Sequence, residues 1–162
     1  MDNEKLIHLE NNCHLKEIGE ILSTNLSSRS EIEKRISTAI RWIGTGMDEE
    51  YDCDKFLKFA VALECLLAKR NEEISTPLAE RCAFILAEDK EKRRDLYKMM
   101  KRLYNTRSEI AHQGKVEIES DNLKKIEWIS ISCIMRLCDN INIYKWQYFS
   151  DLEEWVLERK FG

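Results

Sequence analysis

A scarcity of turn-forming residues limits what this chain can fold into. The 162 residues include one proline and five glycines, whereas a β-sandwich needs many tight turns rich in these residues. Hydrophobic residues make up 43% and charged residues 35% of the chain. That mixture is typical of a folded globular domain and not of a disordered segment. The sequence therefore predicts a single all-α domain.

Apolar residues recur at helical spacing along most of the chain. We expect helices over residues 5–22, 32–47, 56–68, 77–87, 89–112, 120–137 and 149–159. Ser30 and Glu33 have the spacing of a capping box before the second of these helices. Ser75 and Thr76 are expected to cap a helix that begins at Pro77. The helices should pack as an all-α bundle, with residues 56–68 at its centre.

Gly114 and Cys53 help to interpret two of the segments between the expected helices. Gly114 is the expected stop signal of the long helix. The acidic stretch 48–54 is interpreted as a solvated connector, because a calcium loop needs glycine at its sixth position and this stretch has Cys53 there.

Targeting and metal signals are missing from the sequence. No run of eighteen apolar residues occurs, so we expect no transmembrane helix and no membrane partner. The N-terminus is polar and acidic, unlike a signal peptide. None of the six cysteines forms a Cys-x-x-Cys pair, and we expect reduced, mostly buried thiols, no bound metal and no cofactor. A cytoplasmic location is the resulting expectation.

Positive charge is concentrated in one segment. The chain carries a formal net charge of −4, but Lys90 to Arg107 contains eight Lys or Arg and two acidic residues, a local charge of +6 that leaves −10 for the remainder. Such a run usually forms a solvated helix face. The more specific hypothesis is that it forms a track that binds a phosphate backbone. The residues expected to contact RNA are Lys98, Lys101, Arg102 and Tyr104, the last by stacking on a base.

Two charged residues fall on apolar helix faces. On a helical wheel Arg107 lies within about 20° of Leu96, on the stripe that continues through Leu103. Glu64 is flanked by apolar residues in the helix at 56–68. Because a buried charge needs a partner, we expect Glu64 and Arg107 to lie close together at one rim of the core. A structural ion pair is the open alternative to a functional one.

His112 and Ser108 add chemistry to the same helix end. Ser108 shares a face with His112, four residues later. Five residues separate Arg107 from His112, about 140° on an ideal helix, but a long arginine at the end of a helix could still share a cleft with both residues. A charge partner for the helix C-terminus is the alternative role of His112.

The segment Leu103-Tyr104-Asn105-Thr106-Arg107-Ser108-Glu109-Ile110-Ala111-His112-Gln113-Gly114 resembles the signature of HEPN domains, an Arg followed at short distance by a His. The segments 39–42, 54–57 and 62–67, the last reading Ala-Leu-Glu-Cys-Leu-Leu, resemble the Apea-like branch of that superfamily. The resemblance covers residues 29–140. Residues 1–28 lie outside it, and 141–162 form a C-terminal helix expected to pack on the domain or on a dimer partner.

The resemblance implies a HEPN-like up-and-down helical bundle that forms a homodimer with a composite ribonuclease site. Cleavage would need no metal and would leave a 2′,3′-cyclic phosphate, with Arg107 and His112 as catalytic residues and Ser108 and Glu64 supporting them. A defence or toxin role is implied, with RNA as substrate and a regulatory protein or antitoxin as a further partner. Gly114 stands where members silenced by a nucleotidyltransferase antitoxin often have Tyr, so that route of control is not supported. The alternative is a non-catalytic HEPN module that binds RNA, a nucleotide or a protein.

Overall fold

The computed structural model describes residues 15–113 and 117–162. These residues form seven α-helices, one 3₁₀ turn (Leu26–Ser28) and no strand, which confirms the predicted all-α class. The helices are α2 (Leu15–Ser23), α3 (Glu31–Met47), α4 (Asp52–Leu67), α5 (Ser75–Leu86), α6 (Lys90–Gln113), α7 (Ser120–Tyr144) and α8 (Phe149–Phe161). No helix in these two ranges is long and apolar enough to cross a membrane. The start of the helix expected over 5–22 and the stop signal at Gly114 lie outside the described residues.

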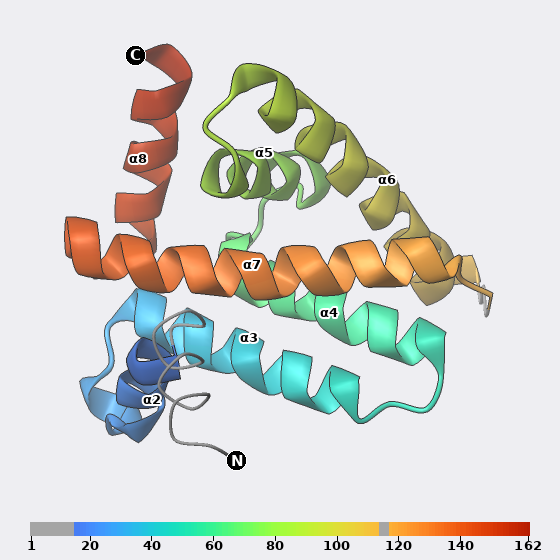
Figure 1. Ribbon diagram of the computed structural model, residues 1–162, viewed down its shortest axis with the longest axis horizontal. Coiled ribbons are helices and arrows are strands. Elements are labelled where there is room, and N and C mark those ends of the chain that lie inside the picture. The colour runs from blue at the N-terminus through green and yellow to red at the C-terminus, as the bar shows by residue number, and fades with distance from the viewer. Residues whose placement is uncertain (1–14, 114–116) are drawn as a thin grey trace, which may run out of the picture.

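The long helix α7 crosses the middle of the view in Figure 1. In that view α3 and α4 run side by side below it, α5 and α6 lie above it, and α8 rises from one end. Helix α4 contacts α3, α5, α6 and α7, so it is the central helix that its nearly uniform apolar sequence predicted.

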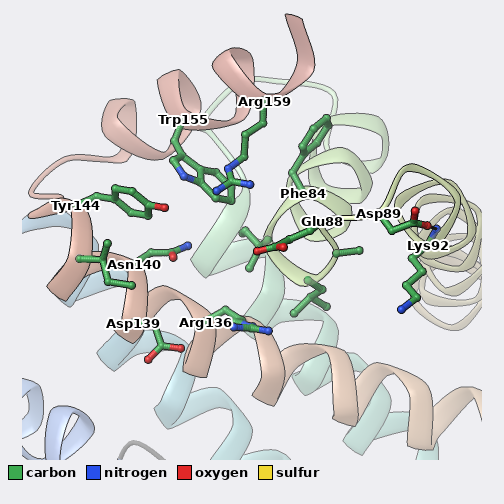
Figure 2. A pocket seen from close by; sticks show the side chains of 14 residues that line it. Phe84, Glu88, Asp89, Lys92, Arg136, Asp139, Asn140, Tyr144, Trp155 and Arg159 are labelled. Carbon is green, nitrogen blue, oxygen red and sulfur yellow. Dashed lines mark hydrogen bonds between the residues drawn. The ribbon is translucent and has the colours of Figure 1, made fainter. Parts of the chain in front are cut away.

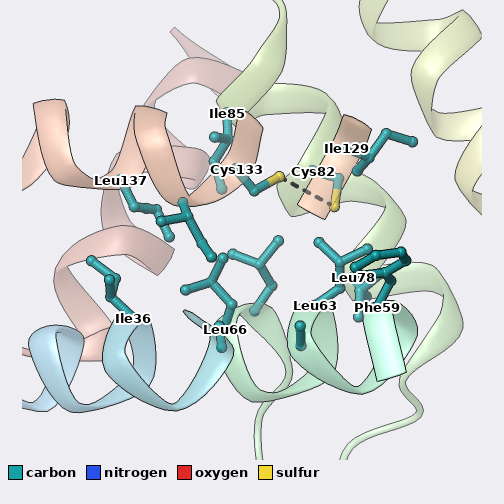
Figure 3. Packing of buried hydrophobic residues seen from close by; sticks show 14 of the residues in the cluster. Ile36, Phe59, Leu63, Leu66, Leu78, Cys82, Ile85, Ile129, Cys133 and Leu137 are labelled. Carbon is teal, nitrogen blue, oxygen red and sulfur yellow. Dashed lines mark hydrogen bonds between the residues drawn. The ribbon is translucent and has the colours of Figure 1, made fainter. Parts of the chain in front are cut away.

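The core is built where α4 faces α5 and α7 (Figure 3). Leu63 and Leu66 of α4 meet Leu78 of α5 and Leu137 of α7, and all four are at most 1% exposed. Each fully buried leucine contributes about 1.5–3 kcal/mol of transfer free energy. Met100 and Leu103 of α6 are buried in the same cluster, so the core also positions α6 beside α4.

The cysteines of the core are packing residues. Cys82, Cys133 and Cys138 are buried and unpaired, as expected, while Cys65 is half-buried and Cys13 lies outside the described residues. The Sγ atoms of Cys82 and Cys133 lie 3.9 Å apart (Figure 3). Burial, followed by the hydrogen bond with Cys82, raises the pKa of the Cys133 thiol well above its ordinary value, which leaves little reactive thiolate.

Two helix starts differ in how well the sequence foretold them. The capping box before α3 is confirmed: the Glu33 N–H donates to Ser30 Oγ at 3.2 Å, and the Ser30 N–H donates to Glu33 Oε2 at 2.7 Å. Helix α4 begins at Asp52 rather than near Phe56, so the end of the acidic connector is helical. Asp52 and Asp54 in its first turn stabilise the positive end of the helix dipole.

The predicted cap of α5 is wrong. Ser75 and Thr76 are themselves the first residues of the helix, and Pro77 follows as the third. The Glu73 carboxylate accepts hydrogen bonds from the backbone N–H groups of Ser75 and Thr76 at 3.0 and 3.2 Å. Those hydrogen bonds, the one from Thr76 first, lower the pKa of Glu73. Pro77 is tolerated because the first turn of a helix leaves its N–H groups without helical partners.

Arginine 81 ties α8 to the rest of the bundle. The residue is 8% exposed. Its guanidinium donates to the Leu67 carbonyl at 2.7 Å and to both oxygens of Glu72 at 2.5 and 3.1 Å. It also donates to Glu153 of α8 at 3.0 Å. It also lies 5.1 Å from the centre of the Phe149 ring. A buried guanidinium of this kind is tolerated only because all of these acceptors satisfy it. Helix α8 therefore packs on this domain through both apolar and ionic contacts.

Candidate functional site

Helix α6 is the scaffold of the candidate site. Asp89 caps it, because its Oδ1 accepts from the backbone N–H groups of Glu91 and Lys92, each at 3.0 Å. The bond from Lys92 is the main reason why the pKa of Asp89 is lowered. Residues Met100 and Leu103 bury the inner face of the helix. The helix continues unbroken to Gln113, so the geometry of its last turns is that of a regular helix.

The predicted proximity of Glu64 and Arg107 is confirmed. Arg107 Nε lies 3.0 Å from Glu64 Oε1, and the two side chains are 23% and 17% exposed. Tyr104, one turn earlier on α6, donates its hydroxyl to the same oxygen at 2.6 Å. The Arg107 guanidinium carbon lies 5.8 Å from the centre of the Tyr104 ring. One carboxylate oxygen of α4 therefore holds two side chains of α6.

Tyrosine 104 is held in its protonated form. Burial is the first cause that raises the pKa of its phenol, and the hydrogen bond to Glu64 and the negative charge of Glu64 raise it further. A protonated hydroxyl remains a donor. The sequence predicted that Tyr104 stacks on a base, and it did not indicate the hydrogen bond from Tyr104 to Glu64. The spacing of three residues between Tyr104 and Arg107 is the signal that could have found it.

The anchoring of Arg107 leaves part of its guanidinium available. Of the guanidinium nitrogens of Arg107, only Nε donates to Glu64, and neither Nη atom donates to another residue within 15–113 or 117–162. A guanidinium fixed at Nε can still present its two Nη groups as a fork to a phosphate or carboxylate. The arrangement can therefore bind an oxyanion without breaking its ion pair.

His112 and Ser108 are both exposed on the last turns of α6. Because α6 is regular as far as Gln113, His112 lies about 140° around the helix from Arg107 and about 7.5 Å further along its axis. No contact between Arg107 and His112 occurs among the described residues, so the single cleft expected at the helix end has no structural support in one chain. Ser108 lies about 40° from His112 and shares its face.

The basic residues of α6 fall on more than one face. On the helical wheel Lys101 lies about 20° from His112, Lys98 about 40°, and Arg102 about 80°. Lys101 donates to the Thr76 hydroxyl of α5 at 3.0 Å, and Lys98 and Arg102 are exposed. Arg94, exposed and five full turns before His112, lies on the same line as the histidine. The spacing of eighteen residues between Arg94 and His112 is visible in the sequence, but Arg94 was not among the predicted RNA contacts.

A separate cavity lies at the other end of α6, between the α5–α6 turn, α7 and α8 (Figure 2). Its volume is about 520 Å³, and it contains none of the residues expected in the functional site. Glu88 and Asn140 point into it from opposite sides. The Arg159 guanidinium already covers the Trp155 ring at 4.2 Å.

The charges of this cavity do not favour an anion. Its three basic and three acidic lining residues balance one another: Lys92, Arg136, Arg159, Glu88, Asp89 and Asp139. Lys92 and Arg107 are separated by about 22 Å along the axis of α6. The cavity is therefore distinct from the site around Arg107.

Within the described ranges no group of three or more His, Cys, Asp or Glu is arranged to hold a metal ion. Comparison of the chain with family models, with curated proteins and with solved structures finds no match. The described residues therefore form an all-α bundle. A cluster of polar and charged residues, Glu64, Tyr104 and Arg107, lies at the rim between α4 and α6.

Proposed function

We propose that this protein is a metal-independent endoribonuclease of the HEPN type, with Arg107 and His112 as its catalytic residues. The observation that supports the proposal most is the anchored arginine: Glu64 fixes Arg107 through Nε and leaves both Nη groups to bind a phosphate. An exposed His112 lies on the same helix, which carries eight of the 26 Lys and Arg residues of the chain and a net positive charge. Phosphate binding, proton transfer and attraction of a polyanion are the three functions that such a nuclease needs.

The reaction proposed is an internal transfer at one phosphodiester. A neutral imidazole of His112 accepts the proton of the ribose 2′-hydroxyl, and the 2′-oxygen forms a bond to the adjacent phosphorus. The bond from phosphorus to the 5′-oxygen of the next nucleotide breaks, and that oxygen receives a proton from a protonated imidazole. The products are a 2′,3′-cyclic phosphate and a 5′-hydroxyl. Histidine suits both proton transfers because its ordinary pKa is near neutrality.

The supporting residues act on the two catalytic ones. Arg107 stabilises the negative charge that develops on the phosphate oxygens in the transition state. Glu64 and Tyr104 hold the guanidinium in place and are positioning residues. Ser108, on the face of His112, orients the imidazole or a phosphate oxygen.

A homodimer would overcome the separation of Arg107 and His112 around α6. A single chain directs them about 140° apart, so one phosphate cannot contact both without a second copy. A two-fold axis beside the end of α6 would bring two copies of each residue to one site. The two imidazoles would then serve as base and acid.

The RNA track is proposed to follow the His112 face of α6. Lys98 and Lys101 lie on or near this face, and Arg94 extends it toward the start of the helix. Arg102 lies further round and would contribute long-range attraction more than direct contact. A cytoplasmic defence or toxin role, with a regulatory protein or antitoxin as a further partner, belongs to the same proposal.

The test is cleavage of total RNA in the presence of EDTA by the wild type, Arg107→Ala and Arg136→Ala. Arg136→Ala is the matched control, because it removes an exposed arginine of α7 that lines the separate cavity and has no contact with Glu64. We expect Arg107→Ala to lose at least about 100-fold in rate and Arg136→Ala to stay within a few-fold of the wild type. End-group analysis should find a 2′,3′-cyclic phosphate. Equal cleavage by all three proteins would remove Arg107 from the mechanism.

The second candidate function is a non-catalytic HEPN module that binds RNA, a nucleotide or a protein. The observation that favours it is the freedom of His112, whose imidazole has no hydrogen-bond partner in the described part of the chain. Nothing in one chain orients it as a base, which efficient catalysis requires. RNA binding without cleavage by the wild type would support this alternative.

A further inference from the structure

A shallow groove adjoins the Glu64–Arg107 pair on the side away from α6. It lies between α3 and α4, with a volume of about 400 Å³. Its lining includes Glu31, Lys34, Arg35, Thr38, Glu64 and Arg70. None of the residues of the proposed RNA track on α6 belongs to it.

Glu64 joins the groove to the candidate site. Its Oε1 accepts from Arg107 Nε and from the Tyr104 hydroxyl, while its side chain also lines the groove. Arg107 itself does not line the groove, so Glu64 is the residue that the groove and the candidate site share. Neighbouring helices pack about 8–10 Å apart, so a strand leaving Arg107 needs to cross only α4 to reach α3.

The charges in the groove are of two kinds. Arg35 is engaged within the fold through two of its nitrogens: Nε pairs with Glu31 at 3.3 Å, and Nη1 donates to the carbonyls of Cys65 and Ala68 at 3.2 and 2.9 Å. It is a structural residue that caps the end of α4.

Lys34 and Arg70 are different from Arg35. Both are exposed at the groove, and neither forms an ion pair with an acidic residue of the described ranges. Of the two acids in the groove, Glu31 is held by Arg35 and Glu64 by Arg107. The unmatched charge that remains is therefore positive, and it lies beside the point where a phosphate would bind.

We propose that this groove binds the single-stranded RNA next to the scissile phosphate, with Lys34 and Arg70 contacting two backbone phosphates. The inference rests on the proposed ribonuclease function. It specifies the path of the substrate: the RNA strand crosses the bundle from α6 over Glu64 to α3, in addition to following α6. A groove this narrow and open suits one extended strand better than a duplex.

Binding of a fluorescently labelled single-stranded RNA to the full chain, measured by anisotropy over a range of salt concentrations, tests the proposal. All proteins carry His112→Ala to prevent cleavage. Adding Lys34→Ala and Arg70→Ala should weaken binding about 10-fold or more. Removing two phosphate contacts from a single strand should also reduce the slope of log affinity against log salt by about 1.4.

Two controls accompany this pair of substitutions. Lys16→Ala with Lys145→Ala removes two exposed lysines of α2 and of the α7 end, and should change affinity less than about two-fold. Lys34→Arg with Arg70→Lys keeps both charges and should bind like the parent protein. Matching thermal melts show that the variants are folded.

The outcomes separate the inference from the function on which it rests. If the wild type cleaves RNA while the Lys34→Ala, Arg70→Ala protein binds as tightly as its parent and with the same salt slope, the groove is not a binding site and the ribonuclease proposal stands. If the wild type cleaves no RNA and the parent protein binds none, both proposals are overturned. A loss of affinity confined to the groove variants supports the crossing path.

Discussion

At the scale of single residues, the Glu64 carboxylate decides the chemistry of its neighbours. One of its oxygens accepts hydrogen bonds from Arg107 and Tyr104 at 3.0 and 2.6 Å, and after burial Glu64 is the main cause of the raised pKa of Tyr104. Hydrogen bonds to a charged acceptor contribute about 1.5–3 kcal/mol each. The same contacts thus stabilise the α4–α6 junction and orient the guanidinium that we propose binds phosphate.

The raised pKa of Tyr104 predicts how stability falls at alkaline pH. A group whose pKa is higher in the folded state stabilises the fold below its unfolded pKa, here about 10. This contribution is lost as the pH rises through the folded value. The free energy of unfolding of the wild type should exceed that of Tyr104→Phe by about 1–2 kcal/mol near neutral pH, and the difference should shrink above about pH 10.

Urea unfolding at a series of pH values measures this difference. Tyr97→Phe is the matched control, since Tyr97 lies on the same helix and donates no hydrogen bond within the described residues. A constant difference between the wild type and Tyr104→Phe up to the highest pH would contradict the proposed bond to Glu64.

Glu72 predicts the opposite dependence at acidic pH. Burial alone would raise its pKa, but the hydrogen bonds from Arg81 and from the backbone N–H of Lys69 outweigh burial and lower it. A carboxyl with a lowered pKa stabilises the fold above its unfolded pKa, about 4.3, and this stabilisation is lost as the pH falls. Glu72→Gln should therefore be less stable than the wild type at neutral pH, and the two should converge in acid. Chemical unfolding from pH 7 downward, with exposed Glu154→Gln as control, measures this; curves that run parallel would exclude the role of Glu72.

Some of these residue contacts could be predicted from the sequence and others could not. Glu64 and Arg107 are charged positions on otherwise apolar stripes, which is enough to expect that they pair. The Glu73 cap of α5 and the Tyr104 bond depend on side-chain direction and on the approach of a neighbouring helix, which spacing alone does not specify. The roles proposed for Ser108, Lys98, Lys101 and Arg102 stay predictions.

At the scale of elements, the helix starts and ends are set by a few polar contacts. Ser30 and Glu33 form a complete capping box at α3, whereas the residue before α4, Tyr51, makes no side-chain cap. Replacing Ser30 by Ala should lower the free energy of unfolding by about 1 kcal/mol. Ser37→Ala, within the same helix, should leave it unchanged or slightly higher, because alanine favours helix interiors. Denaturant titration distinguishes the two; equal stabilities would show that the cap does not stabilise α3.

The sequence located the helices better than it located their ends. Helix α7 was expected to end near Leu137, and it continues to Tyr144. Polar residues between these positions hide the apolar pattern, although Ile141 still packs on the core. The helix stops where Lys145 adopts a left-handed conformation with φ of 58°. Non-glycine residues rarely adopt this conformation, so a lysine at this position does not predict the end of a helix.

At the scale of the whole molecule, activity should require two chains. If the site is composite, the cleavage rate should rise with the square of protein concentration below the dimer dissociation constant and linearly above it. Sedimentation velocity on the same samples gives the dimer fraction for comparison. A protein that is monomeric throughout and cleaves in proportion to its concentration would contradict the composite site.

The proposed mechanism depends above all on proton transfer by the imidazole of His112. This transfer is tested by the rate of RNA cleavage in EDTA by His112→Ala, with Gln113→Ala as the control for an exposed change in the same turn. Loss of a general base or acid costs about 100-fold to 10,000-fold in rate, so His112→Ala should fall to that extent while Gln113→Ala matches the wild type. Cleavage by His112→Ala at the rate of the wild type would contradict the proposed mechanism.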